Sequence, residues 1–151
     1  MEDTLAATGL EPDGLVLEVT ESSVMQNAEV TIAKLDRITQ TGVRLMLDDF
    51  GEGYSSLSHL RRLPVHGLKI ARPFVQELGD IAGDPALVRG IIELANSLGL
   101  RLVAEGIELP VQRDTLRMLG CPLGQGFLFA RPLELPALTT LLHEQRRSPV
   151  S

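Results

Sequence analysis

The sequence is poor in aromatic residues and in cysteine. Aromatic residues make up 3% of the 151 positions, tryptophan is absent, and Cys121 is the single cysteine. A hydrophobic core must therefore be built from aliphatic side chains, and an internal disulfide is excluded. One cysteine without a partner agrees with a reducing compartment, and we expect Cys121 to be a buried structural thiol.

Long apolar runs and an excess of positive charge are also missing. No run approaches the roughly 20 apolar residues that span a bilayer, and the N-terminal segment lacks the basic and apolar regions of a signal peptide. The formal net charge is −6, which argues against DNA binding through a basic surface. These absences predict a cytoplasmic protein, or part of one, with no membrane segment and no DNA partner.

Short apolar runs alternate with segments of helical periodicity along the whole chain. The runs predict strands at residues 15–19, 43–50, 67–71, 100–107 and 124–130. The helical spacing predicts helices at 28–41, 55–62, 85–98, 110–119 and 136–146. Because the runs are apolar at nearly every position, both faces of the strands are expected to be buried. The predicted fold class is α/β, with about five βα units in a parallel sheet, either open or closed into a barrel.

Polar side chains gather near the carboxyl end of each predicted strand. They are Glu18 and Glu21, Asp48 and Asp49, Lys69, Glu105 and Glu108, and Gln125. In a β/α barrel these strand ends converge on one face, whereas a doubly wound sheet would gather fewer of them around one switch point. The pattern therefore favours a partial TIM-type barrel with an acidic site.

Carboxylates that converge repel one another and favour the binding of a cation. Oxygen ligands suit Mg²⁺, Mn²⁺ or Ca²⁺, and the adjacent pair Asp48–Asp49 could serve two ions. Two ions about 3.5–4 Å apart clamp the attacking and leaving oxygens of a phosphoryl group. Lys69 could hold a water molecule or a phosphate oxygen as a point charge.

Each of these residues alone also has a simpler interpretation. Glu21 could begin a helix, where its charge favours the positive helix end, and Asp48–Asp49 could form a turn with an N-cap. Lys69, Glu105 and Glu108 could be solvated surface charges. It is their shared position at strand ends that favours a site.

Five segments of the chain occur in the order and spacing of one known family. They are "LVLEVTES", "LMLDDFGEGYSSL", "LPVHGLKI", "LRLVAEGIE" and "GCPLGQGFLFARPL". These segments resemble the motifs of the EAL-domain family, cyclic di-GMP phosphodiesterases with a modified TIM barrel. The resemblance covers residues 9–133. It implies hydrolysis of cyclic di-GMP to linear pGpG with Mg²⁺ or Mn²⁺ as cofactor.

The resemblance also implies a role for each polar residue. Glu18 corresponds to a metal ligand, Asp48 to a ligand shared by two ions, and Asp49 to a ligand of the second ion. Lys69 corresponds to the lysine that holds the catalytic water, and Glu105 to a metal-site or general-base glutamate. Gln125 and Glu108 correspond to supporting residues at the same rim.

A loop follows the "DDF" strand, and in the family it couples the site to dimerisation. Here the loop runs over residues 50–56 and includes Gly51, Glu52 and Gly53. Glu21 corresponds to the glutamate that anchors it, and Glu108 is placed with Glu21 as a second anchoring residue. The resemblance thus implies a possible homodimer through this loop, and a possible sensory or diguanylate-cyclase-like domain upstream.

Some expected family residues do not occur in the chain. The Glu-Ala-Leu motif and an asparagine ligand are absent, Glu52 stands where threonine is usual, and Ala71 stands where aspartate is usual. We expect residues 1–8 to be a helix remnant, 9–143 the C-terminal part of an EAL domain, and 144–151 a disordered tail.

These departures predict weak or no turnover by this chain alone. The main alternative is a non-catalytic module that binds cyclic di-GMP or a protein partner. Two further alternatives are a half barrel that folds poorly by itself, and a metal-dependent barrel hydrolase of another family.

Overall fold

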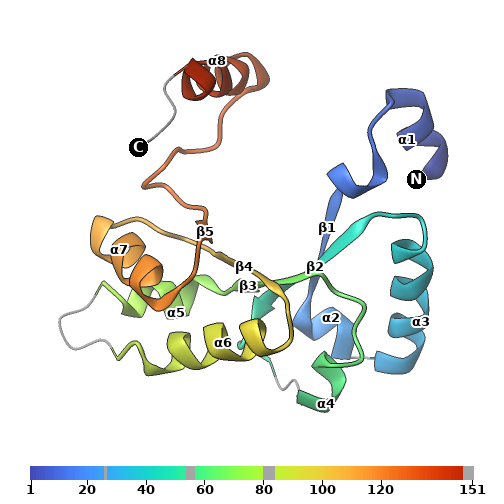
Figure 1. Ribbon diagram of the computed structural model, residues 1–151, viewed down its shortest axis with the longest axis horizontal. Helices are drawn as coiled ribbons and strands as arrows, with labels where there is room; N and C mark the ends of the chain where they lie inside the picture. Colours follow the sequence, from blue (N-terminus) through green and yellow to red (C-terminus); the bar gives the residue numbers. More distant parts are fainter. Residues whose placement is uncertain (26, 54–56, 80–83, 148–151) are drawn as a thin grey trace.

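A computed structural model shows one parallel sheet with helices packed against it (Figure 1). It describes residues 1–25, 27–53, 57–79 and 84–147. The strands are β1 (Val16–Thr20), β2 (Arg44–Phe50), β3 (Gly67–Ile70), β4 (Arg101–Ala104) and β5 (Leu123–Gly124). They lie in the order β1-β2-β3-β4-β5, and every neighbouring pair is parallel. This order contains no reversal, unlike that of a doubly wound sheet, and it confirms the predicted α/β class.

The helices alternate with the strands. They are α1 (Glu2–Thr8), α2 (Glu21–Met25), α3 (Ala28–Thr39), α4 (Leu57–Leu60), α5 (Arg72–Glu77), α6 (Ala86–Ser97), α7 (Pro110–Leu119) and α8 (Leu135–Arg147). A short 3-10 helix (Pro12–Gly14) precedes β1. The bounds of α7 are those predicted, and α1 matches the helix expected at residues 1–8. Helices α2 and α5 were not predicted, because one or two turns are too short to show a periodicity.

Two predictions at the ends of segments are corrected or untested. Helix α8 continues to Arg147, so residues 144–147 are helical and not part of a disordered tail. Residues 148–151, and residues 55 and 56 of the helix predicted at 55–62, lie outside the described residues. None of the described helices combines the length and the apolar character needed to cross a membrane.

The strand predicted at residues 124–130 is wrong over most of its length. Strand β5 ends at Gly124, and the chain then turns around the segment after β4. The Ile107 N–H donates to the Gln125 carbonyl at 3.1 Å, and the Leu128 N–H donates to the Ile107 carbonyl at 3.0 Å. The apolar run predicts a strand, but its backbone groups bond to the loop after β4 instead of to a neighbouring strand.

The core lies between the sheet and the helices on one of its faces (Figure 1). Alternate residues of β2 and β3 are fully buried: Leu45, Leu47, Leu68 and Ile70. Helix α6 covers β3 and β4 with Ile92 and Ala95. The core is aliphatic, as the composition predicts, and Cys121 is buried at 3% exposure, which confirms the expected buried thiol.

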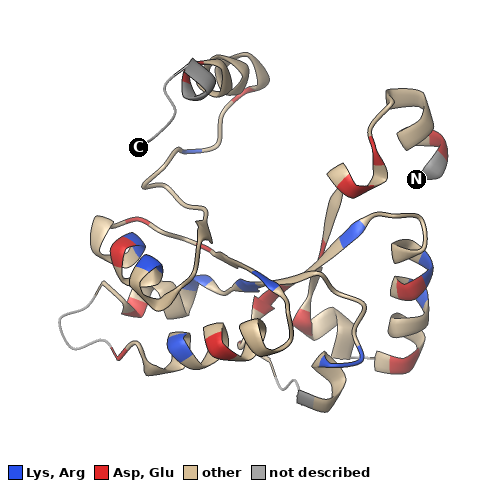
Figure 2. Ribbon diagram, in the orientation of Figure 1, with Lys and Arg blue, Asp and Glu red and all other residues tan. Residues whose placement is uncertain are grey.

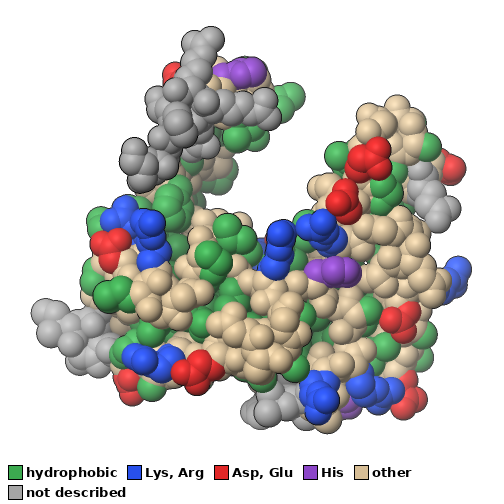
Figure 3. All heavy atoms as spheres, viewed as in Figure 1, with side chains coloured by type: hydrophobic (Ala, Val, Ile, Leu, Met, Phe, Trp, Pro, Cys, Tyr) green, Lys and Arg blue, Asp and Glu red, His purple; other side chains and the backbone are tan. Residues whose placement is uncertain are grey.

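The two terminal arms leave the other face of the sheet open. Figure 3 shows a hollow between the arm that carries α1 and the arm that carries α8, with basic side chains on its floor. Figure 2 shows that acidic residues are spread over helices as well as strands. The overall distribution of charge therefore does not locate a site, and the arrangement of individual side chains has to do so.

Candidate metal and phosphodiester site

The paired aspartates form a β-bulge at the end of β2. Leu47 pairs with Leu68 and Phe50 pairs with Ile70, so Asp48 and Asp49 together oppose Lys69. A bulge adds one residue to a strand and redirects the side chains that follow it. Without it, the alternation of Leu45 and Leu47 would place Asp49 in the core. With it, Phe50 takes the buried position, at 8% exposure, and Asp48 faces Lys69.

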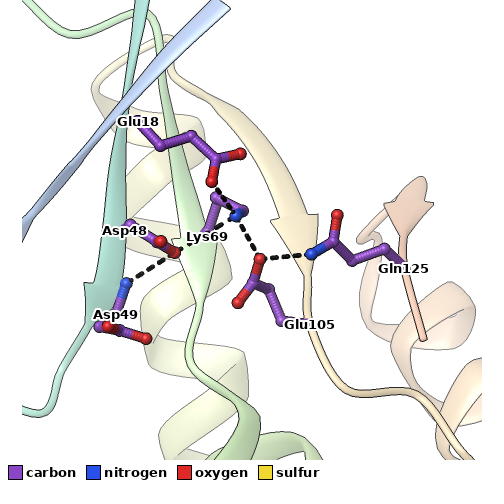
Figure 4. A network of polar contacts seen from close by, with 6 residues as sticks. All are labelled: Glu18, Asp48, Asp49, Lys69, Glu105 and Gln125. Atoms are coloured by element: carbon purple, nitrogen blue, oxygen red, sulfur yellow. Dashed lines mark hydrogen bonds and ion pairs between the residues drawn. The ribbon is translucent and has the colours of Figure 1, made fainter. Parts of the chain in front are cut away.

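Lys69 lies at the centre of the site, with three carboxylates around its ammonium group (Figure 4). Its Nζ lies 2.6 Å from Glu18 Oε2 and 3.4 Å from Asp48 Oδ1, and it is in direct contact with Glu105 Oε1. Glu18 comes from β1, Asp48 from β2, and Glu105 directly follows β4. The Lys69 side chain is only 5% exposed. The structure therefore brings together four of the predicted site residues from four successive strands.

The surroundings of Lys69 keep it positively charged. Burial alone would lower the pKa of Lys69, but the hydrogen bonds to Glu105 and Glu18 and the charges of Glu105 and Asp48 outweigh it and raise that pKa. A lysine with a raised pKa stabilises the fold at all pH values below its ordinary range near 10.4, and this contribution is lost only at still higher pH. Lys69 thus acts as a fixed cation and hydrogen-bond donor, not as a base.

Asp49 lies outside this group of carboxylates. Among the described residues, Glu18, Asp48 and Glu105 each offer an oxygen within 4.8 Å of the others, and Asp49 does not belong to this group. The Asp49 N–H donates to Asp48 Oδ1 at 3.0 Å, and Figure 4 shows the Asp49 side chain pointing away from Lys69. The role of Asp49 as ligand of a second ion stays a prediction.

The backbone at Asp49 has a left-handed conformation, which predicts a specific effect on stability. Its φ is 53°, a conformation that aspartate and asparagine tolerate but β-branched residues do not. We expect Asp49→Val to lower the free energy of unfolding by about 1–2 kcal/mol, and Asp49→Asn to change it by less than about 0.5 kcal/mol. Urea unfolding of both variants measures this. Equal stability of the two variants would contradict the assignment of the bulge.

Two residues at the rim of the cluster bond to glutamates: Gln125 bonds to Glu105, and Arg72 bonds to Glu108. Gln125, directly after β5, donates from Nε2 to Glu105 Oε1 at 2.6 Å. Glu108 accepts from an Arg72 guanidinium nitrogen at 2.6 Å and is not among the clustered carboxylates. Gln125 thus lies where a supporting residue was predicted, while Glu108 lies at the same rim in a separate ion pair.

Glu21 holds the start of the loop that follows β2. Its side chain is 2% exposed, and its Oε2 accepts the Gly51 N–H at 2.8 Å. A Cβ on Gly53 would lie 2.5 Å from Glu21 Oε1, so only glycine allows this approach without a shift. Glu21 also begins α2, as its simpler interpretation expects, and its role as the anchor of the whole loop stays a prediction. Glu52 is exposed, and residues 54–56 of the loop lie outside the described residues.

The cluster has the donor set of a hard divalent cation. Three carboxylates converge on one ammonium group, so a single positive charge faces three negative ones. Carboxylate oxygens are the ligands that Mg²⁺, Mn²⁺ and Ca²⁺ prefer, and further positive charge would relieve the remaining repulsion. The residues present therefore fit a divalent cation held by Glu18, Asp48 and Glu105.

A pocket adjoins the cluster on the side of α8. Its volume is about 450 Å³, and its lining includes Glu105, Gln125, Arg72, Phe127 and Arg131. The guanidinium of Arg131 lies 4.7 Å from the centre of the Phe127 ring. The pocket combines two arginines with an apolar wall, a chemistry suited to an organic phosphate.

Three residues that shape this site were not predicted from the sequence. Arg72, Gln76 and Gln112 each bond to the segment after β4. Gln112 could have been found from the sequence, because it lies two residues after Pro110, which begins a helix, and a glutamine at this position can bond back to the backbone before the helix. The sequence does not indicate Arg72 and Gln76, because the pattern of a six-residue helix does not show which side chain reaches a neighbouring loop.

Comparison with known proteins places these motifs in one family. The model of the EAL domain family matches residues 1–132 of this chain. The bifunctional diguanylate cyclase/cyclic di-GMP phosphodiesterase MucR of Pseudomonas aeruginosa is 44% identical over 133 residues, 88% of this chain and 19% of that protein. The cyclic di-GMP phosphodiesterase NbdA of the same organism is 46% identical over 142 residues, 94% of this chain and 18% of that protein. The chain therefore spans about a fifth of the length of these curated relatives.

Solved structures show the same fold. The PaMucR phosphodiesterase in complex with cyclic di-GMP aligns with a TM-score of 0.85 at 44% identity, covering 91% of this chain and 56% of that chain. The manganese and cyclic di-GMP complex of Klebsiella pneumoniae BlrP1 aligns with a TM-score of 0.79 at 36% identity, covering 86% of this chain and 33% of that chain. These likenesses confirm the predicted TIM-type barrel fold, of which the described part of this chain forms five strands.

Proposed function

This chain belongs to the EAL-domain family, and on that premise we propose that it serves in metal-dependent hydrolysis of cyclic di-GMP to linear pGpG. The observation that carries the proposal is the convergence of Glu18, Asp48 and Glu105 on Lys69. Phosphodiester hydrolysis needs positive charge where the attacking and leaving oxygens develop negative charge. The three carboxylates outnumber the one ammonium group, so the cluster attracts a divalent cation that would supply this positive charge.

The roles of the residues follow from their contacts. Glu18, Asp48 and Glu105 would hold Mg²⁺ or Mn²⁺, which when bound supplies Lewis-acid activation of water and phosphate oxygen. Lys69 donates hydrogen bonds as a fixed cation and orients the attacking water or a phosphate oxygen. Gln125 keeps Glu105 turned toward the cluster through its bond to Oε1. A second ion held by Asp48 and Asp49 is part of this proposal.

The pocket beside the cluster would receive part of the nucleotide. Arg72 and Arg131 line it together with Phe127, so phosphate charge and a planar base each meet a suitable side chain. Its lining includes Glu105 and Gln125, so a ligand bound there would lie next to the cluster. A homodimer through the loop after β2 stays a prediction.

A non-catalytic binding module is the second candidate function. Ala71 supports it, since this residue is fully buried at the N-cap of α5 and provides no side-chain cap, where the family usually has an aspartate. The absence of the Glu-Ala-Leu motif and of the asparagine ligand from this sequence also predicts slow chemistry in the isolated chain. Binding of cyclic di-GMP could persist without these groups.

One assay separates the two candidates. The purified chain is titrated with cyclic di-GMP in the presence and absence of Mn²⁺ by calorimetry, and pGpG is quantified by chromatography in the same samples. Mn²⁺-dependent binding with slow formation of pGpG is the expected result. Binding with no pGpG after prolonged incubation would favour the non-catalytic module, and the absence of both would contradict both functions.

A further inference from the structure

The segment between β4 and α7, residues 105–109, carries two acidic residues of the site but has no regular structure. Within this short segment, the Glu105 side chain contacts Lys69 and the Glu108 side chain contacts Arg72. Neighbouring segments bond to its backbone at Glu105 and at Ile107. The Glu105 N–H donates to the Ile70 carbonyl at 3.1 Å, and the Ile107 N–H donates to the Gln125 carbonyl at 3.1 Å.

A glutamine from α5 holds the middle of this segment. Gln76 Nε2 donates to the Gly106 carbonyl at 2.7 Å. Gly106 has a φ of 70°, and a Cβ there would overlap the Arg72 side chain. The backbone therefore turns at Gly106 in a conformation that favours glycine, and the Gln76 amide fixes the direction of its carbonyl.

A second glutamine, from α7, holds the other end. Gln112 is fully buried, and its Oε1 accepts the N–H groups of Glu108 at 2.8 Å and Leu109 at 2.9 Å. Leu109 is the N-cap of α7, so its bond to Gln112 is the usual return contact from the first turn of a helix. The bond to Glu108 reaches one residue further back, outside the helix. It ties Gln112 to the acidic segment itself.

The turn that follows α5 packs closely against the start of α7, beside Gln112. A Cβ on Gly79 would lie 3.0 Å from Leu109 Cδ1 and 3.2 Å from Gln112 Nε2. Gln112 Nε2 is buried and has no hydrogen-bond partner among the described residues. Burying an unpartnered amide group costs free energy, so any net benefit of glutamine at this position has to come from its oxygen.

We propose that Gln76 and Gln112 are positioning residues that fix the segment 105–109, so that Glu105 faces the carboxylate cluster while Glu108 faces Arg72. This inference rests on the proposed function for its consequence, because Glu105 is one of three carboxylates that would hold the cation. If the segment 105–109 were not fixed, only Glu18 and Asp48 would remain in position to hold the cation. Neither glutamine contacts the cluster, and both act through the backbone.

The test compares four variants with the wild-type chain. Gln76→Met and Gln112→Met remove the amides at similar volume. Gln112→Glu keeps the acceptor oxygen and replaces the unpartnered amide nitrogen by a second oxygen. Gln40→Met makes the same change at an exposed position at the end of α3. Amide hydrogen exchange is measured residue by residue at Glu105 and Ile107, whose N–H groups do not bond to either glutamine, with the amides of β2 as an internal reference for global unfolding.

Exchange at Glu105 and Ile107 should accelerate at least about tenfold relative to β2 in both methionine variants, and not in Gln40→Met or Gln112→Glu. Mn²⁺ affinity, measured by titration of the same proteins, should fall by about 10–100-fold in the methionine variants, as for other residues that orient metal ligands. Unchanged exchange, or faster exchange with unchanged Mn²⁺ affinity, would overturn the inference. A wild-type chain that binds no Mn²⁺ would overturn the proposed function, while the exchange data would still decide whether the glutamines hold the segment.

Discussion

Asp48→Asn is expected to weaken Mn²⁺ binding by this chain on the order of 100-fold or more. Asp48 provides one of three converging carboxylates and lies 3.4 Å from Lys69 Nζ. Loss of residues that merely orient ligands costs about 10–100-fold in metal affinity, so loss of a ligand charge should cost at least the upper end of this range. The asparagine keeps the size and one oxygen, which separates the effect of charge from that of packing.

Asp36→Asn is the matched control for this variant. Asp36 is exposed on α3, so the same change in net charge is made away from the cluster. Titration of both variants, with free Mn²⁺ followed by electron paramagnetic resonance, should show wild-type affinity for Asp36→Asn alone. Equal affinities of the two variants would show that net charge, and not the cluster, accounts for binding.

Lys69→Met is expected to destabilise the metal-free fold by about 2–4 kcal/mol at neutral pH. Removing one partner of a buried ion pair leaves uncompensated charge and typically costs 3–5 kcal/mol. The value should be lower here, because the Glu18 side chain is 46% exposed to solvent. One feature is diagnostic: the stability of the variant should rise on addition of Mn²⁺, which restores positive charge among the carboxylates.

Lys34→Met tests whether the loss of any lysine has this effect. Lys34 is exposed on α3, and its removal should change stability by less than about 0.5 kcal/mol. Urea unfolding of both variants at pH 7, with and without Mn²⁺, gives the comparison. A Lys69→Met protein as stable as the wild type at pH 7 would contradict the central role of the ammonium group.

Much of the fold could be predicted from local patterns. Strand β2 and helix α7 were found within one residue of their observed bounds, because each has a long apolar or amphipathic pattern and a clear end signal. The run at residues 124–130 has the same apolar character but forms a loop around Ile107. The backbone bonds of this run depend on its packing around Ile107, and the order of residue types along the run does not predict that packing.

The site was predictable in its members but not in its geometry. The rule that strand ends converge brought Glu18, Asp48, Lys69 and Glu105 together correctly. The sequence could not show that Asp48 and Asp49 form a bulge, because the register between β2 and β3 is a property of two distant segments. The same limit applies to Gln76 and Gln112, whose partners are backbone groups of a loop and leave no trace in residue type.

The most direct measurement is an anomalous difference map from crystals of this chain grown with Mn²⁺. The account predicts an anomalous peak within coordination distance of Glu18, Asp48 and Glu105. A peak bound only by other residues, or no peak at millimolar Mn²⁺, would contradict the claim that these three carboxylates form a cation site.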